Sequence, residues 1–135
     1  MSSPNTQSHK LVYVVEDDEE QLMILRLILS DAGFQVVTET NADRVLHGVR
    51  ELKPDIILMD VMLPSHQGLD GFSLCAEIRK EPDLRHVKII IVSAIAQGIG
   101  EQRDKVKSQS GADDFIVKPY DPSLLISSIR KLCSS

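Results

Sequence analysis

Apolar runs and amphipathic stretches alternate along the chain from residue 11 onward. Unbroken apolar runs, such as 11–15 and 89–92, are typical of strands buried on both faces of a sheet. Segments in which apolar residues recur every three or four positions are typical of helices with one buried face. The predicted strands cover 11–15, 34–38, 55–60, 88–93 and 114–117. The predicted helices cover 18–32, 41–52, 69–80, 101–108 and 123–132.

Glycine and proline mark the ends of several of these helices. Gly33 follows the first helix at the position where a C-terminal glycine is common. Pro54 and Pro82 follow the second and third helices, which they cannot extend. The spacing predicts that the following side chains face the core: Leu22, Leu25, Ile28, Leu29, Val45, Leu46, Val49, Phe72, Leu74, Cys75, Ile78, Leu124, Leu125, Ile126 and Ile129.

This order of elements predicts a doubly wound α/β fold. Five parallel strands would form one sheet, with five helices covering both faces. The length of 135 residues leaves room for a single domain, and we expect residues 10–133 to form it after a flexible tail at 1–9. In open sheets of this kind, ligands bind beyond the carboxyl ends of the strands. The polar residues that end the predicted strands are therefore the candidates for a functional site.

Five polar residues stand at those strand ends: Glu16, Asp17, Asp60, Ser93 and Lys118. Carboxylates that lie close together repel one another unless a cation compensates their charge. Hard oxygen ligands of this kind favour Mg²⁺. Because aspartyl phosphates are a known covalent form, we expect phosphoryl transfer to Asp60, with the metal and Lys118 neutralising charge and Ser93 donating a hydrogen bond.

The overall charge argues against one class of partner, and the acidic residues are concentrated in one short run. The formal net charge is −5, and the chain has no Trp, two Tyr and three Phe, so we expect no direct contact with nucleic acid. Five of the twenty acids fall in the run 16–20. We assign Glu16 and Asp17 to the metal, and Asp18, Glu19 and Glu20 to a solvated helix start.

Nothing in the sequence indicates a membrane or an oxidising compartment. The polar residues 1–10 form no signal peptide, and the apolar stretch 22–29 is too short to span a bilayer. Cys75 and Cys133 match no metal or redox spacing. We therefore expect a cytoplasmic protein with reduced thiols and no membrane partner.

Six short motifs resemble, in order, those of the receiver domain of bacterial two-component response regulators. They are Val14-Val15-Glu16-Asp17-Asp18, 55–64 with Asp60, Asp70-Gly71-Phe72, Ile91-Val92-Ser93-Ala94, 111–115 and Val117-Lys118-Pro119. The resemblance covers residues 10–132 and implies a flavodoxin-like fold. It also implies a phosphoprotein in which Asp60 accepts a phosphoryl group from the phosphohistidine of a sensor kinase or phosphotransfer protein.

The resemblance assigns further roles by position. It implies Mg²⁺ bound by Asp17, Asp60, Glu16 through water and the backbone carbonyl of Met62. Ser93 and Lys118 would contact the phosphoryl group, and Phe115 would turn inward as a switch when the hydroxyl residue moves. Ala94 would leave the phosphate accessible. Apart from the resemblance, we expect the apolar residues Met62 and Ile95, which flank the site, to slow hydrolysis by excluding a positioned water. The Lys118–Pro119 peptide bond is typically cis in this family.

The resemblance also implies how the signal leaves the domain. The face of the fourth helix, fifth strand and fifth helix would bind a downstream protein or a second copy in a homodimer. Two loops, 65–69 and 97–100, are longer than is common in the family. We interpret His66 in the first loop as a solvated side chain, and we expect no output domain after the last helix.

Three other functions share some of these sequence features. A Mg²⁺-dependent phosphohydrolase needs a proton-transferring residue two positions after its nucleophile, where this chain has Met62. A flavin-binding module needs a phosphate cradle after the first strand, where the acidic run would repel phosphate. A degenerate receiver that signals by docking alone remains open, although all five site residues are present. The sequence therefore favours a phosphoacceptor signalling domain, with at most slow self-dephosphorylation, over an enzyme.

Overall fold

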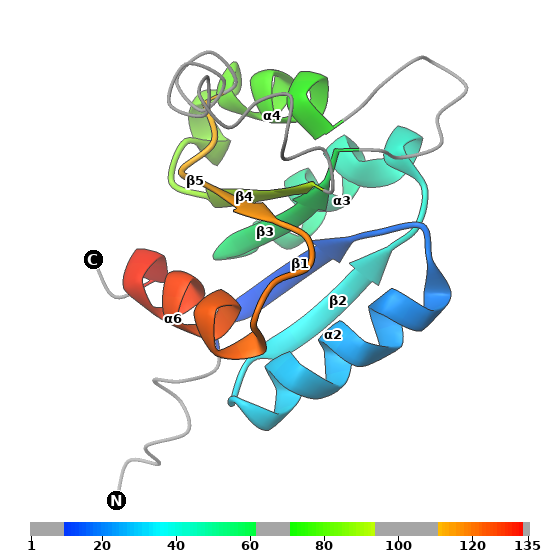
Figure 1. The fold of residues 1–135 in the computed structure, drawn as a ribbon. Coiled ribbons are helices and arrows are strands. Elements are labelled where there is room, and N and C mark those ends of the chain that lie inside the picture. The colour runs from blue at the N-terminus through cyan, green and yellow to red at the C-terminus, as the bar shows by residue number, and fades with distance from the viewer. Residues whose placement is uncertain (1–9, 62–70, 94–110, 134–135) are drawn as a thin grey trace, which may run out of the picture.

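The computed structural model describes residues 10–61, 71–93 and 111–133. Its strands form one parallel sheet in the order β2-β1-β3-β4-β5 (Figure 1). The strands are β1 Leu11–Val15, β2 Gln35–Glu39, β3 Ile56–Asp60, β4 Lys88–Ser93 and β5 Asp114–Val117. The order reverses between β1 and β3, so the carboxyl ends of these two strands lie at the position where doubly wound sheets bind ligands.

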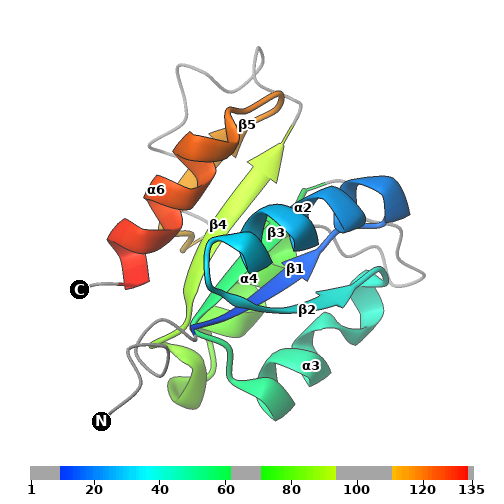
Figure 2. The ribbon, with the colours of Figure 1, turned by 90° about the horizontal axis from the view of Figure 1, so that it is seen from below.

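Helices cover both faces of the sheet (Figure 2). They are α2 Glu19–Asp31, α3 Val45–Leu52, α4 Gly71–Arg79 and α6 Pro122–Cys133, with short 3-10 helices η1 Ala42–Arg44 and η2 Pro82–Leu84. The predicted helix at 101–108 and the predicted tail at 1–9 lie outside the described residues. The sequence-based expectation of a doubly wound parallel sheet in an α/β protein is confirmed.

Two apolar clusters fill the two sides of the sheet. The α2/α6-face core contains Val12, Val14, Leu22, Leu25, Leu29, Phe34, Ile56, Leu58, Ile90, Val92, Ile116, Leu125 and Ile129. The α3/α4-face core includes Tyr13, Val15, Val45, Val49, Ile57, Met59, Leu74, Cys75, Ile78, Ile89, Ile91 and Phe115. Successive strand residues alternate between the two cores, which is why the strand sequences are continuously apolar.

Most predicted boundaries agree with the structure within one or two residues. The predicted helix 41–52 is divided: Asn41 accepts a hydrogen bond from the amide of Asp43 and caps the 3-10 helix η1, and α3 begins directly after η1 at Val45. The prediction that Leu124 faces the core is wrong. Its side chain is 55% exposed, because α6 turns Leu125 and Ile129 toward the sheet instead. Gly33 has φ 98°, as expected for a residue that ends a helix.

The amino-terminal edge of the sheet is held by a cluster of hydrogen bonds around Arg79. Its guanidinium donates to the carbonyls of Gly111 at 2.8 Å and Val87 at 2.6 Å. It also pairs with the Asp113 carboxylate at 2.6 Å. Asp113 in turn accepts a hydrogen bond from the amide of Ile89 at 2.8 Å. Arg79 and Asp113, here called the Arg79 clamp, therefore join the end of α4 to the starts of β4 and β5.

Candidate functional site

The carboxyl ends of β1 and β3 bring three acids together. One carboxylate oxygen each from Glu16, Asp17 and Asp60 lies within 4.8 Å of the other two. Glu16 and Asp60 are buried, with 4% and 8% of their surface exposed, whereas Asp17 is exposed. Among the described residues this is the one cluster of potential metal ligands. The sequence predicted all three, because neighbouring parallel strands must end at the same edge.

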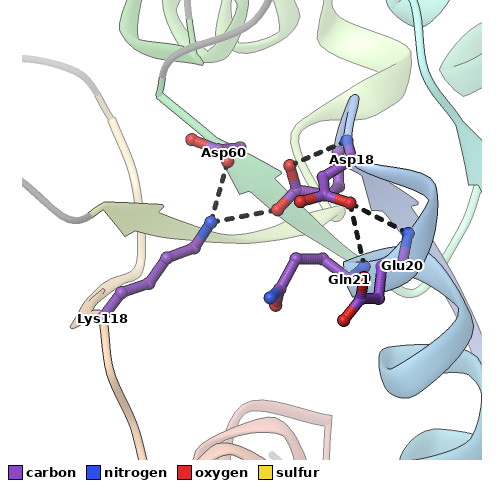
Figure 3. Close-up of polar contacts among 6 residues, drawn as sticks. Asp18, Glu20, Gln21, Asp60 and Lys118 are labelled. Carbon is purple, nitrogen blue, oxygen red and sulfur yellow. Dashed lines mark hydrogen bonds and ion pairs between the residues drawn. The ribbon is translucent and has the colours of Figure 1, made fainter.

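Lys118 bridges the two buried carboxylates. Its ammonium group donates to Glu16 Oε1 at 3.0 Å and to Asp60 Oδ2 at 2.9 Å (Figure 3). The backbone aims this side chain inward, because the Lys118 amide donates to the carbonyl of Ser93 at 2.8 Å. The Lys118–Pro119 peptide bond is cis, as the resemblance implied. The predicted lysine thus lies directly at the acidic cluster.

The charges of this cluster are only partly balanced. Three carboxylates and one ammonium carry a formal charge of −3 + 1 = −2. Burial raises the pKa of Glu16, the hydrogen bond from Lys118 opposes this rise, and the charge of Asp60 adds to it. Burial alone would lower the pKa of Lys118, but its bonds to Asp60 and Glu16 outweigh that effect and raise the pKa. The site therefore has the charge and the oxygen atoms to attract a cation.

Asp18, in the same acidic run 16–20, has a structural role. The Asp18 carboxylate accepts hydrogen bonds from the amides of Glu20 and Gln21 and caps α2 (Figure 3). The Asp18 amide donates to Glu16 Oε2 at 3.3 Å, which helps to orient that carboxylate. Asp18, Glu19 and Glu20 are exposed, as predicted. The capping role could have been read from an aspartate that directly precedes the apolar helical pattern.

Ser93 and Phe115 lie on the two strands beyond β3. Ser93 ends β4 and is 1% exposed, and Asp60 pairs with its neighbour Val92 in the register of the sheet. Phe115 is buried in the α3/α4-face core, where its ring stacks on Phe72 with centroids 6.2 Å apart and planes 17° apart. Ser93 thus lies at the same edge as the acids, while Phe115 lies below it. Met62, His66, Ala94, Ile95 and the loops 65–69 and 97–100 lie outside the described residues.

Sequence reasoning missed the close packing of α4 against the end of β3. A Cβ atom built on Gly71 would lie 2.7 Å from the backbone oxygen of Asp60 and 2.9 Å from Val61 Cα. The Gly71 amide donates to the carbonyl of Val61 at 3.1 Å. Only glycine permits this approach. The Asp70-Gly71-Phe72 motif contains this glycine, but the sequence alone does not show which part of the backbone it approaches.

The fold and site together define a class of protein: a doubly wound α/β domain with an acidic cation site and a lysine at the strand ends. A model of the response regulator receiver domain matches residues 12–130. The chemotaxis protein CheY of Thermotoga maritima is 35% identical over 125 residues, which cover 91% of this chain and 97% of that protein. The chain therefore belongs to the response regulator receiver domain family. Receiver domains are phosphoacceptor signalling modules that interact with histidine kinases.

Two further comparisons extend this result. A probable transcriptional regulator, ycf27 of Pyropia yezoensis, is 36% identical over 122 residues, and the match covers 90% of this chain but 46% of that regulator. A solved receiver domain of a sensor histidine kinase from Pseudomonas aeruginosa has a TM-score of 0.81 and 28% identity, covering 94% of this chain and 99% of that one. That structure has a magnesium ion coordinated in its active-site cleft. None of the helices within the described residues is long and apolar enough to cross a membrane.

Proposed function

We propose that Asp60 is the phosphoacceptor of this chain and that Asp17, Asp60 and Glu16 hold the Mg²⁺ on which the reaction depends. The observation that carries this proposal is the cluster of three carboxylates with only Lys118 to balance them. Glu16, which is the most buried of the three, would act through water. The backbone carbonyl of Met62, implied by the resemblance, stays part of the proposal.

The donor set suits magnesium in particular. Mg²⁺ binds oxygen atoms at about 2.1 Å, keeps several waters and uses one or two carboxylates. Carboxylate oxygens within 4.8 Å of one another can share such an ion directly or through those waters. Binding would also bring the formal charge of the cluster from −2 to zero. When bound, the ion would neutralise charge on the transferring phosphoryl group.

The residues of this chain then have distinct parts in the transfer. A carboxylate oxygen of Asp60 attacks the phosphorus of the donor, an O–P bond forms, and the P–N bond to the donor histidine breaks with its electron pair left on nitrogen. Lys118, which now contacts Asp60, stays close enough to bind an oxygen of the arriving phosphoryl group. Ser93 donates a hydrogen bond to another phosphoryl oxygen.

The remaining parts of the proposal concern signalling. A sensor kinase or phosphotransfer protein would supply the phosphoryl group. Movement of Ser93 toward it would be accompanied by a change at Phe115. The face formed by β5, α6 and the predicted fourth helix would bind a downstream protein or a second copy. A cytoplasmic location is part of this proposal, and it agrees with the finding that Cys75 and Cys133 form no disulfide. A flexible tail at 1–9 followed by a domain at 10–133 likewise stays a proposal.

Phosphorylation by a small donor tests this function. The chain is incubated with acetyl phosphate and Mg²⁺, and its intact mass is measured. We expect one added phosphoryl group, none when EDTA removes the metal, and none in Asp60→Asn. Asp83→Asn is the matched control, because Asp83 is an exposed aspartate in η2, away from the cluster. An undiminished adduct in Asp60→Asn would contradict the proposal.

A further inference from the structure

Tyr120 lies next to the site but was assigned no role. It follows Lys118 and Pro119 and precedes α6. Its side chain is half-buried and packs against the α2/α6-face core, whereas Phe115, on the other side of Lys118 in sequence, belongs to the α3/α4-face core. The lysine segment is therefore flanked by one aromatic residue on each side of the sheet.

Tyr120 borders two separate spaces. The first is a cavity of about 10 Å³, whose lining combines apolar side chains of the α2/α6-face core with Glu16, Asp60 and Lys118. The second is a groove of about 440 Å³ along α2, lined by residues that include Gln21, Ile24, Ile28 and Pro122. The two side chains that line both spaces are Lys118 and Tyr120. Tyr120 therefore stands at the boundary between the groove and the cavity.

The cavity and the groove differ in how much water they can hold. A space of about 10 Å³ is at the lower limit for one water molecule, so the cavity holds at most one. The groove is large enough to be filled by solvent. Burial raises the pKa of Tyr120, Lys118 lowers it, and Glu16 and Asp60 raise it, so the phenol is near all three charged groups. Removing the ring would join the groove to the cavity and bring water to the inner side of these groups.

We propose that Tyr120 is a positioning residue of the site, whose ring separates the groove from the cavity and thereby keeps Lys118 fixed between Glu16 and Asp60. Charge-assisted hydrogen bonds are stronger where water is excluded, because the local dielectric constant is lower. With water admitted, the ammonium group can exchange its carboxylate partners for solvent. In this proposal the volume of the aromatic ring separates the groove from the cavity, and the hydroxyl group is not required.

The first test measures the accessibility of Lys118 directly. The protein is treated with a water-soluble amine-acylating reagent, and labelling of Lys118 is mapped by peptide mass spectrometry relative to the exposed Lys53. We expect labelling to rise severalfold in Tyr120→Ala and to stay at the wild-type level in Tyr120→Phe. Ile126→Ala is the control for lost packing, because Ile126 packs against the same core but does not line the cavity. If Tyr120→Ala is unfolded, Tyr120→Val replaces it, with the same expected direction.

The second test measures the initial rate of phosphorylation by acetyl phosphate, and this readout rests on the proposed function. We expect the rate to fall roughly tenfold in Tyr120→Ala, since misplacement of a catalytic group by about 1 Å can cost 100-fold. Tyr120→Phe and Ile126→Ala should stay near the wild-type rate. Equal Lys118 labelling in folded Tyr120→Ala and wild type, or an equal rise in Ile126→Ala, overturns the inference. If instead the proposed function is wrong, the phosphoryl adduct persists in Asp60→Asn. The labelling of Lys118 does not depend on phosphorylation, so that test stays valid in either case.

Discussion

The two edges of the sheet both contain clusters of charged side chains, most of them partly or fully buried, but they balance those charges differently. At the amino-terminal edge, the side chains of the Arg79 clamp are 21% and 28% exposed, one cation faces one anion, and the remaining guanidinium donors bond backbone carbonyls. At the carboxyl edge, three carboxylates share one ammonium group. The first arrangement has a formal charge of zero and the second a charge of −2.

This difference separates a structural cluster from a functional one. A charge pair in which one cation faces one anion has no surplus charge for a ligand to neutralise. A cluster with surplus charge is destabilising by itself and gains stability when a counter-ion binds. The receiver site is thus recognisable from its charge imbalance, and substitutions at the two edges should have opposite effects on stability.

The largest expected effect is at the clamp. Arg79→Ala leaves Asp113 unpaired and removes donors from two carbonyl groups, so we expect the free energy of unfolding to fall by about 2–4 kcal/mol. Urea unfolding measures this. Arg50→Ala is the matched control, since Arg50 bonds the Glu81 carboxylate through two nitrogens on the surface. Its loss should cost much less than the loss of Arg79, because water screens an exposed ion pair. If both variants lost the same free energy of unfolding, the Arg79 clamp would be no more stabilising than a surface ion pair, which would contradict this account.

A smaller effect should appear at two neighbouring aspartates at the start of α2. Asp18→Ala removes the cap of α2 and should lower the free energy of unfolding by about 1 kcal/mol. Asp17→Asn removes one of three clustered charges and should raise it by about 0.5–1 kcal/mol, measured without Mg²⁺. Each variant loses one negative charge, so a general charge effect would move both in the same direction. Two shifts of the same sign would contradict the account of the acidic run.

At neutral pH we expect no effect of ionisation at Tyr13, a buried polar group between the two edges, and its effect on stability should appear only at alkaline pH. Burial, with a contribution from Glu39, raises the pKa of Tyr13 from 10.0 to about 12. The folded state therefore favours the neutral phenol, so its contribution is fully present below pH 10 and is lost as the pH rises toward 12. We expect wild-type protein to lose more stability than Tyr13→Phe over this range, as measured by urea unfolding at several pH values. Parallel pH profiles for the two proteins would show that Tyr13 does not titrate as described.

The sequence was sufficient for most of the fold because the strands are buried on both faces. Uninterrupted apolar runs bounded by polar residues gave β4 at 88–93 and β5 at 114–117 with their observed bounds. The pattern was less informative where several apolar residues are adjacent. Leu124, Leu125 and Ile126 allow more than one inward face, and only packing against the sheet selects Leu125. One helix was predicted at 41–52 where the chain forms η1 and α3, because the apolar pattern does not distinguish a 3-10 first turn from an α-helical one.

The site was predicted to the extent that topology alone determines it. Parallel strands end at a common edge, so Glu16, Asp17, Asp60 and Lys118 had to converge there. Contacts between side chains distant in sequence could not be obtained in this way. Arg79 and Asp113 are 34 positions apart, and neither stands at a strand end of the predicted site. The location of Tyr120 between a groove and a cavity likewise depends on how α2 and α6 pack, which periodicity does not specify.

The response of thermal stability to Mg²⁺ tests the central claim, that surplus negative charge at the carboxyl edge is compensated by a divalent cation. The melting temperature is measured for wild type, Asp17→Asn and Asp113→Asn as MgCl₂ is added, against NaCl at equal ionic strength. We expect it to rise with MgCl₂ in wild type and to stay constant in Asp17→Asn. Asp113→Asn should melt at a lower temperature but rise with MgCl₂ as wild type does. A rise in Asp17→Asn equal to that of wild type, or no rise in wild type, would contradict the account.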